Sequence, residues 1–171
     1  MRILNLGSGK RFIPDAVTVD WRPETSPDVV HDLNRFPWPL EDNTYDAVYC
    51  MDVIEHLEDI VKTMEEIHRV SKAGANVHIT TPHFSCANSY TDPTHRHHLG
   101  IFSFDYFTGE NQLDFYTKAR FKKVRADLMF YPKFKNKLIW RFAKMSPLFY
   151  EEHLTWIFPA WFMSFELEVI K

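Results

Sequence analysis

The chain has few cysteines and no long apolar run. Only two cysteines occur in 171 residues, Cys50 in an apolar segment and Cys86 in a polar one, which argues against a structural disulfide and for reduced thiols. No apolar run approaches the roughly 18 residues of a membrane-spanning helix. Met1 and Arg2 lead directly into an apolar segment, without the charged-then-apolar pattern of a leader. We therefore expect a cytoplasmic protein.

Internal repeats and low-complexity segments are also missing, and the 45% of apolar residues suffices for one core. The net charge is only −3, but half of all lysine and arginine residues lie in one stretch with a single acid, Asp127. This stretch forms either a solvated basic face or a site for an anionic substrate or an anionic membrane surface. Its basic residues are Lys118, Arg120, Lys122, Lys123, Arg125, Lys133, Lys135, Lys137, Arg141 and Lys144.

Short β-branched or alternating apolar runs, bounded by turn residues, predict seven strands. The spacing of apolar residues from Ile54 to Val70 predicts an amphipathic helix between the fourth and fifth strands, with Gly74 at its C-terminal stop. Further helices are expected near 103–119, and over 134–163 with breaks at its prolines. The expected strands span residues 2–7, 16–21, 28–32, 45–51, 75–81, 123–131 and 164–170.

The connections in the N-terminal half are too short for crossover helices. Few residues separate Gly7 from Ala16, and the links 21–28 and 33–42 each contain two prolines. Because parallel sheets bury both faces, we expect another element to cover this half of the sheet and its apolar residues. The candidates are the Trp- and Phe-rich segment 138–162 and a second protomer. The apolar residues in question are Leu4, Leu6, Val17 and Val19.

Three segments follow one another in an order that suits nucleoside binding. Residues 3–9 form an apolar strand that runs into a turn of small residues, and residues 17–20 form a strand that ends on Asp20. Glycine lets the backbone approach a ligand closely, and a carboxylate at the tip of the next strand can accept both hydroxyls of a ribose. The third segment, residues 45–57, is a strand that ends in acids and a histidine.

These segments resemble the class I S-adenosylmethionine-dependent methyltransferases, in particular small single-domain members of the type 11 kind. Leu4-Asn-Leu-Gly-Ser-Gly9 matches the glycine motif of that family, Asp20 its ribose-binding acid, and His31-Asp-Leu33 the segment near adenine. Residues 36–48, 52–57 and 69–79 match the fourth-strand motif and the helix-turn-strand that follows. The sequence departs from the family pattern in having only two glycines in the first motif and Ala73-Gly74-Ala75 in place of a Pro-Gly-Gly turn.

The resemblance implies an α/β, Rossmann-like fold with a seven-stranded, mostly parallel sheet in the order 3-2-1-4-5-7-6. It also implies one domain over 1–171, with a cofactor-binding half at 1–83 and an acceptor-binding half at 84–171. Helices would be reduced in the N-terminal half, and a helical lid at about 134–163 would precede the last strand. The residues that would hold S-adenosylmethionine are Asn5, Gly7, Ser8, Gly9, Asp20, Trp21, Asp32, Leu33, Met51, Asp52 and His56.

Acids and histidines follow the fourth and fifth strands, at the sheet edge where ligands of such folds bind. Two branches of the family, ubiquinone-pathway O-methyltransferases and small-RNA 3′-terminal 2′-O-methyltransferases, hold a divalent cation with similar residues. The similarity implies cation ligands at Asp52, Glu55, His56 and His95. In family members that have this motif but hold no cation, the acid caps the helix and the histidine lines the pocket. The candidates for a general base are His56, His83 and His95.

The expected activity is methyl transfer to an oxygen or nitrogen nucleophile of a small acceptor, either anionic or glycolipid-like. One alternative is a non-catalytic S-adenosylmethionine-binding or scaffold protein. Another is a nicotinamide-dinucleotide enzyme, because Asp20 would also suit that ribose. We expect a monomer or a homodimer that acts on a small molecule and does not bind nucleic acid. Peripheral membrane contact stays open as an alternative.

Overall fold

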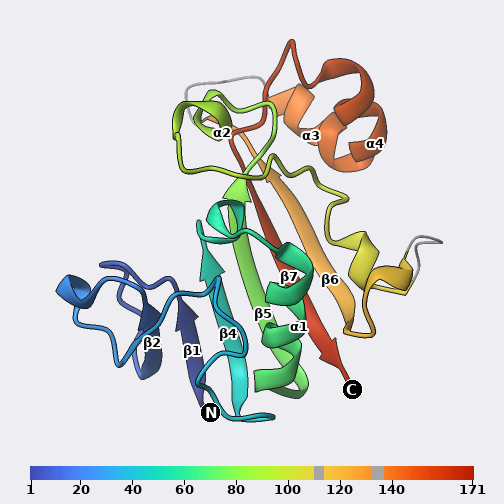
Figure 1. Cartoon of the computed structure of the whole chain (residues 1–171). Coiled ribbons are helices and arrows are strands. Elements are labelled where there is room, and N and C mark those ends of the chain that lie inside the picture. Colours follow the sequence, from blue (N-terminus) through green and yellow to red (C-terminus); the bar gives the residue numbers. More distant parts are fainter. Residues whose placement is uncertain (110–113, 132–136) are drawn as a thin grey trace.

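The computed structural model describes residues 1–109, 114–131 and 137–171. One seven-stranded sheet, in the order β3-β2-β1-β4-β5-β7-β6, forms its centre (Figure 1). β7 runs antiparallel to β5 and β6, and the other paired strands are parallel. The predicted fold class and strand order are therefore confirmed. The strands are β1 (Ile3–Leu6), β2 (Ala16–Asp20), β3 (Val29–Val30), β4 (Tyr45–Met51), β5 (Ser71–Pro82), β6 (Arg120–Met129) and β7 (Phe162–Ile170).

Helices are few and short. No α-helix occurs in residues 1–59, as the short, Pro-rich links predict. Within the described ranges, no helix has the length and apolar character needed to cross a membrane. The α-helices are α1 (Ile60–Val70), α2 (Ala87–Thr91), α3 (Lys137–Met145) and α4 (Pro147–Phe149). Single turns of 3-10 or π helix occur at η1 (Pro23–Thr25), η2 (Ile54–His56), η3 (Asp105–Phe107), η4 (Asp114–Tyr116) and η5 (Tyr150–Leu154).

The helix between β4 and β5 is shorter than predicted at both ends. Asp59 caps its start, because the side chain accepts a hydrogen bond from the Lys62 amide at 2.9 Å. At its end, Ser71 donates its hydroxyl to the Ile67 carbonyl at 2.6 Å and begins β5 at once. The prediction of Gly74 as the helix stop is wrong, because the serine satisfies that end and Gly74 lies inside β5.

The predicted helical region 103–119 contains only the turns η3 and η4 in its described residues.

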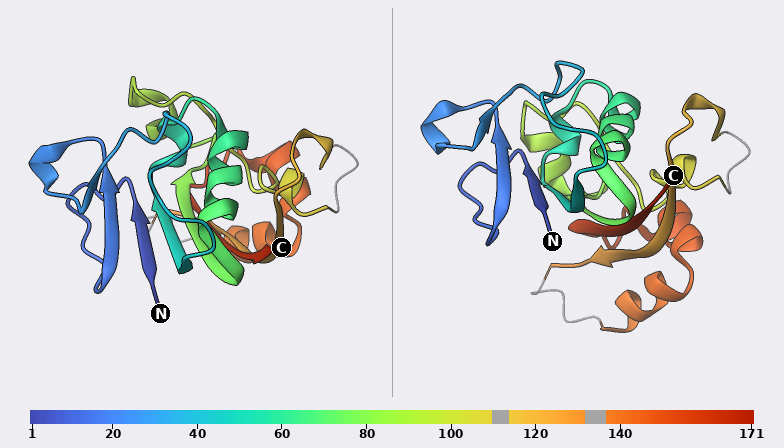
Figure 2. Two further views of the ribbon diagram at one scale, coloured as in Figure 1. Left: turned by 60° about the horizontal axis from the view of Figure 1, so that its bottom comes forward. Right: turned by 90° about the horizontal axis from the view of Figure 1, so that it is seen from below.

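The sheet has one apolar face and one polar face. β7 alternates strictly between buried and half-exposed residues, and β5 does so over most of its length. The buried residues of neighbouring strands, such as Leu4, Val48 and Val77, are paired in register and lie on the face covered by α1 (Figures 1 and 2). The opposite face carries Asn5, Tyr49, His78, Glu166 and Arg125 in one row across five strands.

Because only one face of the sheet is apolar, the N-terminal half of the sheet does not need the additional covering element that we expected from the sequence. Leu4, Leu6 and Val19 are at most 1% exposed, and they pack into the main core. An extended segment between β3 and β4 takes the place of a helix there, with Trp38 in the same core and its indole N–H bonded to the Leu33 carbonyl at 3.0 Å. The expectation that residues 138–162 or a second protomer must cover these side chains is therefore wrong.

The aromatic segment instead lies over the far end of the sheet. α3 and α4 pack near the end of β6, away from β1 and β2 (Figures 1 and 2). Trp140 donates its indole N–H to the Leu128 carbonyl at 3.3 Å, and this bond ties α3 to β6. Several apolar side chains of the segment stay exposed, among them Leu138, Met145, Trp156 and Ile157. Lys133 and Lys135 of the basic stretch, and residues 134–136 of the expected lid, lie outside the described residues.

Candidate functional site

The glycine turn after β1 is held in a left-handed conformation at two positions. Gly7 and Gly9 have φ values of 58° and 51°, which glycine adopts without a steric penalty. A Cβ on Gly7 would lie 2.4 Å from a methyl carbon of Val53, whereas a Cβ on Gly9 would meet only Arg22, at 3.8 Å. Gly7 is thus required by packing, and Gly9 leaves an open backbone surface. Asn5 braces the turn by donating to the Arg11 carbonyl at 3.1 Å.

Asp20 ends β2 with its side chain aimed at this turn. One carboxylate oxygen accepts a hydrogen bond from the Gly9 amide at 2.7 Å, and the other from the Arg22 amide at 2.9 Å. Asp20 is only 3% exposed. A carboxylate has about four acceptor sites, so these two bonds leave sites for the hydroxyls of a ribose. The predicted ribose-binding acid is therefore placed beside the glycine turn, and the residues fit the nucleoside of S-adenosylmethionine.

The other predicted nucleoside contacts surround the same strand ends. Trp21 follows Asp20 directly and is 68% exposed, so it does not belong to the core. Leu33 is buried, and Asp32 accepts a hydrogen bond from the Asn34 amide at 3.0 Å. Ser8 is 5% exposed and donates its amide to the Val19 carbonyl at 3.1 Å. These residues follow the ends of β1, β2 and β3.

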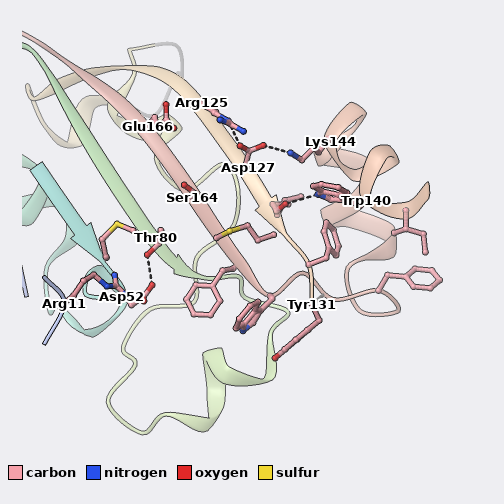
Figure 3. A pocket seen from close by; sticks show the side chains of 18 residues that line it. Arg11, Asp52, Thr80, Arg125, Asp127, Tyr131, Trp140, Lys144, Ser164 and Glu166 are labelled. Carbon is pink, nitrogen blue, oxygen red and sulfur yellow. Dashed lines mark hydrogen bonds and ion pairs between the residues drawn. The ribbon is translucent and has the colours of Figure 1, made fainter. Parts of the chain in front are cut away.

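A large groove lies on the polar face of the sheet, with a volume of about 1250 Å³ (Figure 3). Of the predicted cofactor residues, only Met51 and Asp52 line it, so the groove starts where β4 ends. The far end is lined by apolar and aromatic side chains from β6, α3 and the segment before β7. The aromatic members are Phe130, Tyr131, Trp140, Phe158, Trp161 and Phe162.

The charges of the groove are arranged in pairs. At the β4 end, Asp52 accepts hydrogen bonds from Arg11 at 2.8 Å and from the Thr80 hydroxyl at 2.6 Å (Figure 3). Further along, Asp127 pairs with Lys144 at 2.8 Å and with Arg125. Burial raises the pKa of Asp127, but the hydrogen bond and the charge of Lys144 outweigh it and lower the pKa overall. The basic and acidic residues lining the groove balance, as Arg11, Arg125 and Lys144 against Asp52, Asp127 and Glu166.

Three of the four predicted cation ligands come together. Ligand atoms of Glu55, His56 and His95 lie within 4.8 Å of one another. Asp52 lies apart from this group and holds Arg11 and Thr80 instead. Burial raises the pKa of Glu55 to about 7, with a smaller contribution from the charge of Asp52. Burial, and then the neighbouring His95, lower the pKa of His56, which favours the neutral form of this imidazole.

His83, the third candidate for a general base, is not accessible. Its side chain is fully buried, and both ring nitrogens are occupied, by the Ser85 hydroxyl at 2.7 Å and by Glu151 at 3.1 Å. Glu151 also accepts a hydrogen bond from the Ile101 amide at 2.6 Å. The geometry gives His83 a structural role in joining the segment after β5 to η5.

Sequence reasoning missed two parts of the site. Arg11 follows the glycine motif, but nothing in its local pattern indicated that it would reach Asp52. The polar floor of the groove comes from Ser164 and Glu166 of β7, opposite Asp127 and Arg125 of β6. The alternation of polar and apolar residues in β7 could have shown that one face of this strand is open.

Comparisons with known proteins agree with this geometry. Residues 13–79 match the methyltransferase domain family. No protein of curated function matches the sequence significantly. An S-adenosylmethionine-dependent methyltransferase from Archaeoglobus fulgidus has a similar structure, with a TM-score of 0.64 at 17% identity over 98% of this chain and 85% of that one. One from Mesorhizobium loti gives a TM-score of 0.63 at 14% identity over 98% and 90% of the two chains.

A third similar structure contains the cofactor. Phosphoethanolamine N-methyltransferase 2 from Haemonchus contortus, in complex with S-adenosyl-L-methionine, gives a TM-score of 0.60 at 15% identity over 99% of this chain and 48% of that one. At such low identities the structures establish the fold, and the match over residues 13–79 adds the sequence motifs. The motifs of residues 13–79 and the fold together support a class I S-adenosylmethionine-dependent methyltransferase.

Proposed function

We propose that this protein transfers a methyl group from S-adenosylmethionine to an oxygen or nitrogen nucleophile of an amphiphilic small molecule bound in the groove. One observation carries the proposal: the groove begins at Met51 and Asp52, at the same sheet edge as the glycine turn and Asp20. A donor held at that edge and an acceptor held in the groove would therefore meet at the end of β4. Positioning of this kind supplies a large part of the rate acceleration in such displacements, on the order of 7 to 11 kcal/mol.

The cofactor, when bound, supplies an electrophilic methyl group on a sulfonium and leaves as a thioether. Asp20 would accept the ribose hydroxyls, and the open backbone at Gly9 would let the ligand approach. Arg11 is half-exposed beside Asp52 and would pair with the carboxylate of the methionine part. The neutral imidazole of His56 would accept the proton that the acceptor loses.

The lining of the groove narrows the class of acceptor. Aromatic side chains dominate its far end, and the charges along it balance, so the buried part of the acceptor is expected to be apolar or aromatic. This supports the glycolipid-like alternative over an anionic one. Leu138, Trp140, Phe142 and Met145 are exposed apolar residues of α3, which lines the groove, and they would suit an acceptor that partitions between water and a membrane surface. Two buried free cysteines support a reducing, cytoplasmic compartment.

A scaffold that binds the cofactor without turnover is the second candidate. It is favoured by the pairing of the two acids beside the glycine turn and the groove, since both oxygens of Asp20 and of Asp52 already accept hydrogen bonds. A nicotinamide-dinucleotide enzyme is a third candidate, but the match of residues 13–79 to the methyltransferase domain argues against it.

Calorimetric titration with S-adenosylmethionine, S-adenosylhomocysteine and NAD separates the three functions. We expect saturable binding of the first two ligands and none of NAD, followed by transfer of a labelled methyl group to members of a panel of alkyl phenols, alcohols and amines. Binding without transfer to any panel member favours the scaffold. Binding of NAD alone, or of none of the three, would contradict the proposal.

A further inference from the structure

The helix α3 carries apolar side chains on two of its sides. On the inner side, Ala143 is fully buried, and Trp140 bonds to β6 through its indole N–H. Ile139 and Trp140 also line the groove. On the outer side, Leu138 and Met145 are 76% and 79% exposed. Packing and the groove therefore account for only one side of this helix.

The outer side of α3 is a continuous apolar stripe. Leu138, Phe142 and Met145 are spaced by four and three residues, which places them on one face of the helix. α4 extends this stripe, because the ring of Phe149 meets that of Phe142 edge to face at 5.6 Å. These four side chains, each at least 41% exposed, form the outer patch. Contiguous apolar patches on a protein surface mark docking sites for proteins or membranes.

The sequence that carries the outer patch is basic. Residues 128–150 include five lysine or arginine residues and no acid. Among them, Arg141 and Lys144 are exposed on α3. The acids that bound this stretch are both engaged, since Asp127 pairs with Lys144 at 2.8 Å and Glu151 bonds to a buried histidine at 3.1 Å. An apolar face flanked by cations is typical of a helix that binds an anionic membrane surface.

A second copy of the chain suits the outer patch less well than a membrane does. The symmetric interface of a dimer sets a patch against itself, so the basic stretches of the two copies would face each other. Charged residues are also depleted in the cores of protein interfaces. An anionic bilayer instead offers acyl chains to the apolar side chains and phosphate headgroups to the cations.

We propose that α3 and α4 dock the protein on an anionic membrane surface through the outer patch. α3 would lie in the plane of the interface, with Leu138 and Met145 among the acyl chains and Arg141 at the level of the headgroups. The glycine turn after β1 lies at the other end of the sheet (Figures 1 and 2). It would therefore stay in contact with water while the protein is docked.

Docking would bring the groove to the membrane surface. Trp140 and Lys144 of α3 line the groove (Figure 3), so the same helix would contact the bilayer on one side and the bound acceptor on the other. An amphiphilic acceptor concentrated in the bilayer would then have a short path into the groove. The docking itself does not rest on the proposed methyl transfer, because vesicle binding is measured without cofactor or acceptor.

The test is flotation of the full chain with lipid vesicles. One set of vesicles contains equimolar phosphatidylcholine and phosphatidylglycerol, and the other contains phosphatidylcholine alone. We expect saturable binding to the anionic vesicles and binding at least about tenfold weaker to the neutral ones. Binding to the anionic vesicles should weaken as the salt concentration rises, because salt screens the basic residues.

Variants of exposed residues make the test specific. Leu138→Ser and Met145→Ser change side chains that are mostly exposed, and each should weaken binding to the anionic vesicles about tenfold. Arg141→Gln should weaken it about fivefold, with little effect on binding to neutral vesicles. Phe115→Ser is the matched control, because Phe115 is 71% exposed on η4, outside the outer patch, and should leave binding unchanged.

A fluorescent label identifies the face that meets the membrane. Cys50 and Cys86 are buried, so an environment-sensitive thiol dye should react with Met145→Cys in preference to them. We expect the emission of this dye to shift to the blue when anionic vesicles are added. The same dye on Phe115→Cys should show no shift.

Circular dichroism would confirm that each variant is folded. The inference would be overturned if the parent chain did not bind anionic vesicles, or if Leu138→Ser and Met145→Ser bound them as tightly as the parent does. A blue shift at position 145 that depends on protein concentration and not on vesicles would also overturn it and would assign the outer patch to a second copy. Vesicle binding by a protein without methyl transfer would support the docking and count against the proposed function alone.

Discussion

The carboxylate of Asp20 accepts a hydrogen bond from the Gly9 amide at 2.7 Å, across eleven residues of sequence. The contact couples the acid at the end of β2 to the turn after β1, so one side chain both shapes the turn and faces the proposed ribose site. Its structural and binding roles must be separated in any test.

Asp20→Asn makes this separation. The amide oxygen still accepts one hydrogen bond, but the second anionic acceptor is lost. We expect cofactor affinity to fall by roughly 1.5 to 3 kcal/mol, the range for hydrogen bonds to a charged group, with a smaller loss of stability. Calorimetric titration with S-adenosylhomocysteine and thermal unfolding of the free protein measure the two effects. Glu24→Ala, an exposed acid in the next turn, is the control. Unchanged affinity in folded Asp20→Asn removes Asp20 from the site.

Gly7 and Gly9 are expected to tolerate alanine unequally. Both have positive φ, so each substitution costs about 1 to 2 kcal/mol in backbone strain. Gly7→Ala also forces a Cβ to 2.4 Å from Val53 and should cost about 1 to 3 kcal/mol more. Urea unfolding measures the difference. The double variant Gly7→Ala with Val53→Ala should be less destabilised than the sum of the two single variants. Strict additivity would show that the two side chains do not clash.

The sequence predicted most of the sheet, because strand patterns and family motifs are local. Asp20, Gly7 and Gly9 were found for the same reason, since each sits at a strand end marked by a turn. The sequence could not predict which side chains pack against the N-terminal half of the sheet, where no α-helix covers it. Trp38 reaches the core from an extended, Pro-rich link, and the opposite face needs no apolar cover because it carries polar side chains such as Asn5 and His78. Arg11 meets Asp52 only through tertiary packing, and no periodicity in the sequence encodes that contact.

His83 is expected to matter for stability and not for cofactor binding. His83→Asn removes the bond to Glu151 and leaves a buried carboxylate oxygen with fewer donors, which should cost about 1 to 3 kcal/mol. Affinity for S-adenosylhomocysteine should stay within twofold of the parent protein. His78→Asn, on the open polar face of β5, is the control for stability. A fully stable His83→Asn protein that has lost affinity would place His83 in the site.

Asp127 should make stability depend on pH in the acid range. Its pKa is lowered in the folded protein, so the group stabilises the fold above its unfolded pKa of about 3.9, and this contribution is lost as pH falls through the lower, folded value. Asp127→Asn should therefore be less stable than the parent at pH 6, by less than about 1 kcal/mol because the pair is partly solvated. The difference should shrink as the pH falls from 6 to 3. Urea unfolding at both pH values tests it, and a difference independent of pH would contradict the assignment.

Arg11 offers the sharpest test of how the donor would lie in the site. The structure places its guanidinium 2.8 Å from Asp52, at the β4 end of the groove, where the methionine part of the proposed cofactor would extend from the nucleoside. If Arg11 pairs with the methionine carboxylate, Arg11→Gln should weaken S-adenosylhomocysteine binding at least about tenfold, since hydrogen bonds between charged groups contribute about 1.5 to 3 kcal/mol.

The same variant should bind 5′-methylthioadenosine as well as the parent does, because that ligand keeps the nucleoside and lacks the carboxylate. Lys10→Gln changes the same charge one residue away on an exposed side chain and should leave both affinities unchanged. An equal loss for both ligands would mean that Arg11 acts by holding the glycine turn in place. Unchanged affinity for both would mean that its charge serves Asp52 alone, and the donor would then have to be anchored by another group at this edge.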